Sequence, residues 1–224
     1  MKKILVFAAH PDDAETCVSG TIMHFHDQGS QIHLLNLTNK GGARTPHSEK
    51  CAELMGATMS YMDFSDEGEG LEHDKVEHLG VMFDEPHLKA VYDEIKAFQP
   101  DLILAHWPVD SHPDHNATGS LVLRASDLIR LDDTDLCPEL WFYGPCTGYQ
   151  SLCFKPDTYI DVTPYMERIK ELYQIYNKVV PIMDIWEIDE TALRYNGFQS
   201  GSFYAEGFIK CNFRKGTPRY QLKP

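Results

Sequence analysis

The chain has 224 residues, of which 42% are hydrophobic and 24% charged, as in a globular protein with one sizeable core. Its 34 acidic and 20 basic side chains give a formal net charge of -14, which repels phosphate backbones and anionic lipid surfaces. We therefore exclude nucleic acids and membranes as partners and expect a small neutral or amphoteric substrate.

The chain shows no sign of export. A short apolar stretch follows Lys2 and Lys3 but ends at once in His-Pro-Asp-Asp, and no apolar run approaches the roughly 18–20 residues that span a bilayer. The six cysteines are scattered without a C-x-x-C pair, which favours reduced thiols over disulfides or a zinc-cysteine site. These features predict a cytoplasmic protein.

Strand and helix patterns alternate along the first two thirds of the chain. Strands that are separated by helices of this length form βαβ units. The pattern therefore predicts an α/β fold of the Rossmann-like, three-layer α/β/α type with a mostly parallel sheet. The predicted strands cover residues 3–9, 31–38, 58–64 and 101–106, and the predicted helices cover residues 13–28, 48–55, 88–98 and 115–130.

The last third of the chain is less regular. We find no repeat and no linker, so we predict a single domain over residues 1–224. The acidic segment 63–84 is long for a connection, which indicates either mobility or a function. The C-terminal elements are expected to be irregular strands at residues 140–143, 151–154, 158–162 and 202–211, and helices at residues 164–176 and 189–199.

The first candidate site is the His-Pro-Asp-Asp segment at residues 10–13, which connects the first predicted strand to a helix. Ligands of open α/β sheets bind at the carboxyl ends of strands. The proline-initiated turn can direct His10 and Asp13 at one point. An imidazole nitrogen with a carboxylate oxygen suits Zn²⁺ or Fe²⁺ better than Ca²⁺, which prefers oxygen ligands. Taken alone, a His-Pro-Asp segment is more typical of a turn with an Asp helix cap.

The second candidate site is the His-Pro-Asp-His segment at residues 112–115, which also lies between a predicted strand and a helix. Because the carboxyl ends of parallel strands share one edge of a sheet, the two segments are expected to converge. A catalytic metal commonly has three protein ligands and one open position. This count predicts two ligands from the first segment and one from the second.

Together the two motifs resemble the LmbE-like, or PIG-L, family of metal-dependent N-acetylglucosaminyl deacetylases. The motifs are specific, and weaker matches extend over most of the chain. These matches are Thr38 with Gly41 and Gly42, Arg44 ahead of Gly56, the segment Asp161-Val162-Thr163, and the segment Tyr204-Ala205-Glu206-Gly207-Phe208.

The resemblance implies a LmbE-like fold and an amide hydrolase that uses zinc, or alternatively ferrous iron. It also implies a small N-acetylated amino-sugar substrate and is compatible with a homo-oligomer. Carried over position by position, it assigns the metal ligands as His10, Asp13 and His115, the general base as Asp12, the residue that stabilises the transition state as His112, the partner that orients it as Asp114, and a substrate contact as Arg44.

These roles agree with the chemistry of amide hydrolysis. A divalent metal lowers the pKa of water towards about 7 and polarises the carbonyl. Asp12 is adjacent to a ligand and can accept the water's proton without being a ligand itself. His112, if protonated and held by Asp114, would donate a hydrogen bond to the oxyanion. Either Asp12 or His112 could then protonate the leaving amine.

The substrate side is less defined. Trp107 precedes the second motif and offers a face on which a sugar could stack, and Glu206 could bind a sugar hydroxyl or a histidine next to the metal. Tyr176-Asn177-Lys178 stands where many family members have a His and a Ser-Gln, so the natural substrate is open. The alternatives are hydrolysis of another acyl-amide and a non-catalytic metal- or sugar-binding module, while the absence of a G-x-G-x-x-G fingerprint disfavours a nucleotide-binding Rossmann protein.

Overall fold

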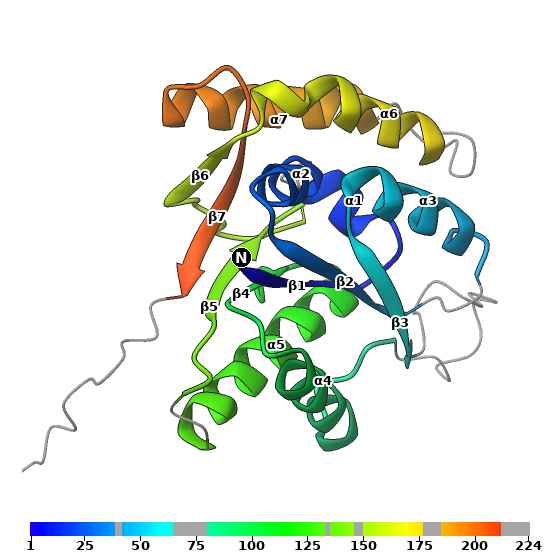
Figure 1. Cartoon of the computed structure of the whole chain (residues 1–224), viewed down its shortest axis with the longest axis vertical. Coiled ribbons are helices and arrows are strands. Elements are labelled where there is room, and N and C mark those ends of the chain that lie inside the picture. Colours follow the sequence, from blue (N-terminus) through cyan, green and yellow to red (C-terminus); the bar gives the residue numbers. More distant parts are fainter. Residues whose placement is uncertain (39–41, 65–79, 133–134, 146–149, 177–184, 212–224) are drawn as a thin grey trace, which may run out of the picture.

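The protein is built around a seven-stranded sheet, as seen in a computed structural model (Figure 1). The structure describes residues 1–38, 42–64, 80–132, 135–145, 150–176 and 185–211. The strand order is β3-β2-β1-β4-β5-β7-β6, so the chain moves outwards from β1 in both directions. The strands are β1 (Lys3–Ala8), β2 (Gln31–Thr38), β3 (Thr58–Phe64), β4 (Leu102–His106), β5 (Glu139–Tyr143), β6 (Thr158–Asp161) and β7 (Ala205–Cys211).

The sheet is mostly parallel, as the sequence predicts. Strands β1 to β5 pair in parallel, whereas β7 runs antiparallel to β5 and β6 antiparallel to β7. The central strands β1 and β4 are buried on both faces and are continuous apolar runs, which is typical of sheets covered by helices on both sides.

Helices cover both faces of the sheet and make a three-layer arrangement (Figure 1). Two separate apolar clusters form, because alternate residues of β1 such as Val6 and Phe7 point to opposite faces. Among the described residues, no helix is long and apolar enough to cross a membrane. One layer contains α1 (Asp13–Cys17), α2 (Ser19–Asp27), α3 (Thr45–Met55), α6 (Met166–Tyr176) and α7 (Ile185–Ser200), and the other contains α4 (Glu85–Phe98) and α5 (Pro113–Asp132).

The helix predicted at residues 13–28 is instead two helices, separated at Val18. The backbone of Val18 has φ -141°, outside the helical region, so the N–H groups at the start of α2 need an acceptor other than the preceding turn. Glu206 on β7 supplies it: its two carboxylate oxygens accept hydrogen bonds from Gly20 N and Thr21 N, each at 2.8 Å. The sequence pattern missed this break because the apolar periodicity continues across it.

Two further predictions of strands were inaccurate. No strand forms at residues 151–154, where Ser151 makes only an isolated bridge to Asp110 before the chain turns. The late strand begins at Ala205 rather than at residue 202. Within the acidic segment 63–84, residues 65–79 lie outside the described part of the chain.

Replacing Glu206 by Gln tests its role at the start of α2. The variant loses one acceptor oxygen and should be less stable by about 1–3 kcal/mol at about pH 5. Burial raises the pKa of Glu206 to about 7, above its ordinary 4.5. The carboxyl group's contribution is therefore present below pH 4.5 and lost as the pH rises through about 7. Urea unfolding should show a smaller gap between wild type and variant at about pH 8.5.

Glu53→Gln is the matched control, because Glu53 is an exposed glutamate on α3. It should change stability little at either pH. A gap between wild type and Glu206→Gln that stays constant or widens with pH would contradict the assignment.

Candidate metal and catalytic site

The turn after β1 fixes the first candidate segment. Asp13 Oδ2 accepts a hydrogen bond from the backbone N–H of His10 at 2.8 Å, which closes the turn. Asp12, in the middle of it, has φ 130° and ψ -25°, a conformation that non-glycine residues rarely adopt. Such backbone strain costs on the order of 1–3 kcal/mol and is concentrated at functional sites.

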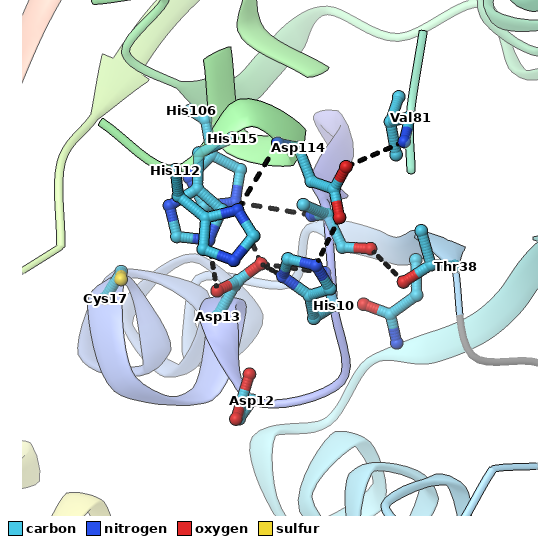
Figure 2. A network of polar contacts seen from close by, with 12 residues as sticks. His10, Asp12, Asp13, Cys17, Thr38, Val81, His106, His112, Asp114 and His115 are labelled. Atoms are coloured by element: carbon cyan, nitrogen blue, oxygen red, sulfur yellow. Dashed lines mark hydrogen bonds and ion pairs between the residues drawn. The ribbon is translucent and has the colours of Figure 1, made fainter. Parts of the chain in front are cut away.

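Three imidazole rings stack beside the carboxylate of Asp13 (Figure 2). His115 lies between His106 and His112, with ring centroids 4.2 Å and 4.5 Å away and near-parallel planes. His115 Nε2 is 3.2 Å from Asp13 Oδ1, and His106 Nε2 is 3.0 Å from Asp13 Oδ2. The two sequence-distant segments therefore converge as predicted, and His106 at the end of β4 joins them.

Two more carboxylates, those of Asp114 and Asp110, lie next to histidines of this cluster. Asp114 Oδ2 lies 2.9 Å from His10 Nε2, and Asp110 Oδ1 lies 3.5 Å from His115 Nδ1. Asp110 also accepts hydrogen bonds from His112 N and Ser151 Oγ, each at 2.8 Å. Carboxylates that orient histidines in this way are usual around metal sites.

Asp114 does not orient His112 in the way that the sequence analysis expected. Its carboxylate holds His10 and accepts a hydrogen bond from Val81 N at 2.7 Å (Figure 2). Asp114 reaches His112 through the backbone, because its N–H donates to His112 Nδ1 at 3.3 Å. Sequence proximity does not distinguish a side-chain contact from a backbone contact, and the role of Asp114 as the partner that orients His112 stays a prediction.

The charges around Asp13 reinforce one another. Burial by itself would raise the pKa of Asp13, but the adjacent His115 and His106 outweigh it and hold the pKa well below the ordinary value. Burial likewise opposes the charged form of His115, yet Asp13 and Asp110 raise its pKa to about 9. His106 is fully buried, and burial lowers its pKa to about 4. The buried carboxylate and the imidazoles around it therefore shift one another's pKa values, down for Asp13 and up for His115.

Asp12 forms an ion pair with Arg44, whose Nη1 lies 2.8 Å from Asp12 Oδ2. The two side chains are 28% and 38% exposed, so the pair lies at the mouth of the site. Burial and the negative charge of Asp13 raise the pKa of Asp12, and Arg44 lowers it. Arg44, predicted to contact substrate, thus contacts the predicted base and also lines the pocket.

The donor atoms fit a divalent metal of the zinc or ferrous type. His10, His112 and His115 offer nitrogens within 4.8 Å of one another, and Asp13, His106 and His115 offer a second such group. The predicted ligands His10, Asp13 and His115 draw on both groups. Buried imidazole nitrogens with a carboxylate oxygen are the donors that these metals prefer.

The site opens into a pocket of about 230 Å³. Trp107 and Glu206, predicted as substrate contacts, are not among its described lining residues. The Trp107 indole donates a hydrogen bond to Leu152 O at 3.0 Å, and Glu206 caps α2 instead. The described lining residues are His10, Asp12, Asp13, Thr16, Cys17, Arg44, His112, His115, Pro145, Gln150, Ile185 and Asp189.

The sequence analysis missed several of the residues that shape the site. His106 ends a predicted strand, so the rule that ligands bind at the carboxyl ends of strands would have found it. Asp110 and Asp189 gave no comparable signal, because their roles depend on loop and helix packing. Among the residues that depart from the family pattern, Tyr176 donates a hydrogen bond to the buried Glu15 at 2.8 Å. Residues 177–178 and Gly41 lie outside the described part of the chain.

The sequence matches the model of one protein family, PIG-L, described as GlcNAc-PI de-N-acetylase, over residues 5–126. Diacetylchitobiose deacetylase from Thermococcus kodakarensis is 27% identical over 233 aligned positions, which cover 92% of this chain and 82% of that protein. Both candidate segments lie within the matched range.

Solved structures agree on the fold. N,N'-diacetylchitobiose deacetylase from Pyrococcus horikoshii is 24% identical with a TM-score of 0.74, and the alignment covers 99% of this chain and 89% of that one. GalB, the 4-carboxy-2-hydroxymuconate hydratase from Pseudomonas putida KT2440, is 21% identical with a TM-score of 0.75, covering 96% and 98%. At these identities the likeness shows a shared fold and does not choose between the two chemistries.

Replacing Gly80 by Ala tests the contact between the end of the segment 63–84 and the site. Gly80 has φ +66°, and a Cβ there would lie 2.1 Å from Asp114 Oδ1. The Asp114 carboxylate would have to leave Val81 N and His10, so the variant should lose more stability than backbone strain alone causes. Strain at such a position costs on the order of 1–2 kcal/mol. Urea unfolding measures the loss.

Gly29→Ala is the matched control, because Gly29 has φ +81° with nothing within 4 Å of the added Cβ. It should show the cost of strain alone. Equal losses in the two variants would mean that Gly80 is not packed against Asp114.

Proposed function

The chain belongs to the PIG-L family, and on this premise we propose that it is a metal-dependent hydrolase that removes the acetyl group from an N-acetylglucosamine-type sugar or conjugate. The observation that carries the proposal is the convergence of the 10–13 and 112–115 segments on one pocket. There an ion-paired carboxylate that is not needed as a ligand, Asp12, stands beside a buried set of metal donors. A pure binding module has no use for such a base.

In this proposal His10, Asp13 and His115 hold a zinc or ferrous ion. Asp114 pairs with one nitrogen of His10 at 2.9 Å, which orients this ring. Asp110 lies 3.5 Å from His115 Nδ1, so it acts on His115 by its charge rather than through a hydrogen bond. When bound, the metal supplies a Lewis acid that polarises the amide carbonyl and acidifies water.

Asp12 acts as the general base. Its strained backbone lies between two ligands, so its side chain stands beside the metal donors without joining them. Arg44 pairs with one carboxylate oxygen at 2.8 Å and favours the ionised form, which is the form that accepts a proton from water. Asp12 then returns this proton to the nitrogen as the C–N bond breaks. The second proton of the water passes from the new carboxyl group to the amine, so that acetate and the protonated amine leave.

His112 stabilises the oxyanion as a neutral donor. Because Asp114 N–H donates to His112 Nδ1, that nitrogen carries the lone pair and Nε2 carries the hydrogen. Burial, together with the electrostatic influence of the neighbouring His115 and His10, also lowers the pKa of His112. A neutral Nε2–H can donate a hydrogen bond to the oxyanion. This arrangement favours Asp12 rather than His112 as the acid that protonates the amine.

The pocket favours a neutral substrate of about one sugar ring. Its volume of about 230 Å³ is below the roughly 300–1,000 Å³ that drug-sized ligands occupy. Arg44 is the single arginine or lysine among the described lining residues, and Asp12 already neutralises it. The name of the hydratase GalB indicates a carboxylated substrate. Apart from the proposed metal, the described walls here offer such a substrate no unpaired lysine or arginine. The cytoplasmic location and a homo-oligomer stay predictions from the sequence.

Alanine variants should separate ligands from neighbours. Purified wild type that is offered zinc or ferrous iron should bind about one ion per chain. Asp13→Ala and His115→Ala should lose it, because each removes a ligand. His112→Ala is the matched control and should keep most of the metal, since His112 serves the substrate. Elemental analysis after gel filtration measures the content. Loss of metal from His112→Ala but not from Asp13→Ala would replace the predicted ligand set by His10, His112 and His115.

Asp12→Asn should abolish catalysis while metal binding persists. The variant keeps the shape of the side chain but cannot accept a proton, so acetate release from N-acetylglucosamine conjugates should fall about 10²- to 10⁴-fold. Asp93→Asn on α4, whose side chain is 56% exposed, is the control and should leave the rate unchanged. If Asp12→Asn keeps full activity, Asp12 is not the base. If wild type with bound metal releases no acetate from any conjugate, the deacetylase proposal is wrong.

A further inference from the structure

A buried carboxyl group on α7, that of Asp189, forms part of the pocket wall. It has no role in the proposed hydrolysis. Asp189 lines the pocket together with Ile185 and is only 2% exposed. Its Oδ2 accepts a hydrogen bond from the Tyr173 hydroxyl group at 2.6 Å. Its Oδ1 is buried and has no hydrogen-bond partner among the described residues. Only one of the two carboxylate oxygens therefore has a hydrogen-bond partner in the described part of the chain.

An acceptor left in this state is costly. A buried oxygen without a partner costs about 1–3 kcal/mol, and most buried polar atoms in proteins are paired. A purely structural partner for Tyr173 would not require a second, unpaired oxygen at a pocket wall. Burial raises the pKa of Asp189 to about 6, and the Tyr173 hydrogen bond offsets this only in part. The unpartnered Oδ1 is therefore an acceptor that a donor group in the pocket would satisfy.

The protein itself offers no cation to Asp189 within the described lining. The one arginine there, Arg44, is committed to Asp12 at 2.8 Å. Within the described part of the chain no side chain pairs with Oδ1, so a donor on the ligand would complete it, and an ionised carboxylate cannot supply one. The proposed amino-sugar substrate carries hydroxyl groups around its ring, which are donors of the required kind.

We propose that Asp189 is a substrate-binding residue whose Oδ1 accepts a hydrogen bond from a ring hydroxyl group of the amino sugar, an inference that rests on the proposed function. Tyr173 holds the carboxylate in place for this contact. Its hydroxyl group lies 2.6 Å from Asp189 Oδ2 and 3.1 Å from Thr16 O on α1, so one phenol ties α7 to the helix that follows the metal segment. Both helices lie on the same face of the sheet (Figure 1).

Binding of N-acetylglucosamine and its 3-, 4- and 6-deoxy derivatives tests the proposal. Calorimetry is done in the Asp12→Asn background, so that the sugar is not consumed. One deoxy derivative should bind about 10- to 100-fold more weakly than the parent sugar, because it leaves the carboxylate unpaired. With Asp189→Asn added, the parent sugar should weaken by a similar factor and the difference between parent and that derivative should largely disappear. Tyr173→Phe is the matched control: it removes the internal partner of Asp189 and should still distinguish the derivative.

Each outcome decides the proposal. If no deoxy derivative binds more weakly than the parent, or if none of the sugars binds, Asp189 does not hold a sugar hydroxyl group, whether or not the Asp189 variant folds. If Asp189→Asn keeps the discrimination, the residue is structural. If the discrimination depends on Asp189 but wild type releases no acetate, the hydroxyl contact stands and the deacetylase proposal fails, which separates the two.

Discussion

The carboxylate of Asp13 is the point on which the site depends. One oxygen closes the turn with His10 N and lies next to His106, and the other lies 3.2 Å from His115. A single buried charge therefore ties the ends of β1 and β4 to the start of α5. The imidazoles in turn keep Asp13 ionised, because their charge outweighs the cost of its burial. Neither partner would be stable here alone, since an unpaired buried charge is costly.

This constraint explains the strain at Asp12. If both His10 and Asp13 must face the same cluster, the residue between them has to turn the chain sharply, and it does so at φ 130°. The result is that Asp12 faces Arg44 at the mouth of the pocket while its neighbours face the buried imidazoles. The strained backbone at Asp12 thus lets two adjacent carboxylates face different partners. Backbone strain of this kind is concentrated at functional sites.

The sequence predicts those parts of the molecule that local patterns encode. The apolar runs predicted β1 to β4 and the helices between them. The rule that ligands bind where strands end pointed to the two candidate segments, residues 10–13 and 112–115. The break at Val18 was not predictable, because it depends on Glu206, which comes from β7 and lies far along the chain. The partner of Asp114 was hidden for the same reason: Gly80 and Val81 reach it from a segment that has no regular pattern. Long-range polar contacts, rather than periodicity, account for these failures.

The chemistry follows from side chains on this fold and not from the fold itself. The same architecture is shared by a hydratase whose substrate name indicates carboxyl groups and by deacetylases of N-acetylated sugars. In this chain Arg44 is neutralised by Asp12, and the pocket adds a further carboxyl group at Asp189. The described walls therefore offer an anionic group no unpaired lysine or arginine, and they offer a hydroxyl group the acceptor that we propose at Asp189. The charges around the donor set are therefore the feature of this chain on which its choice of substrate is expected to depend.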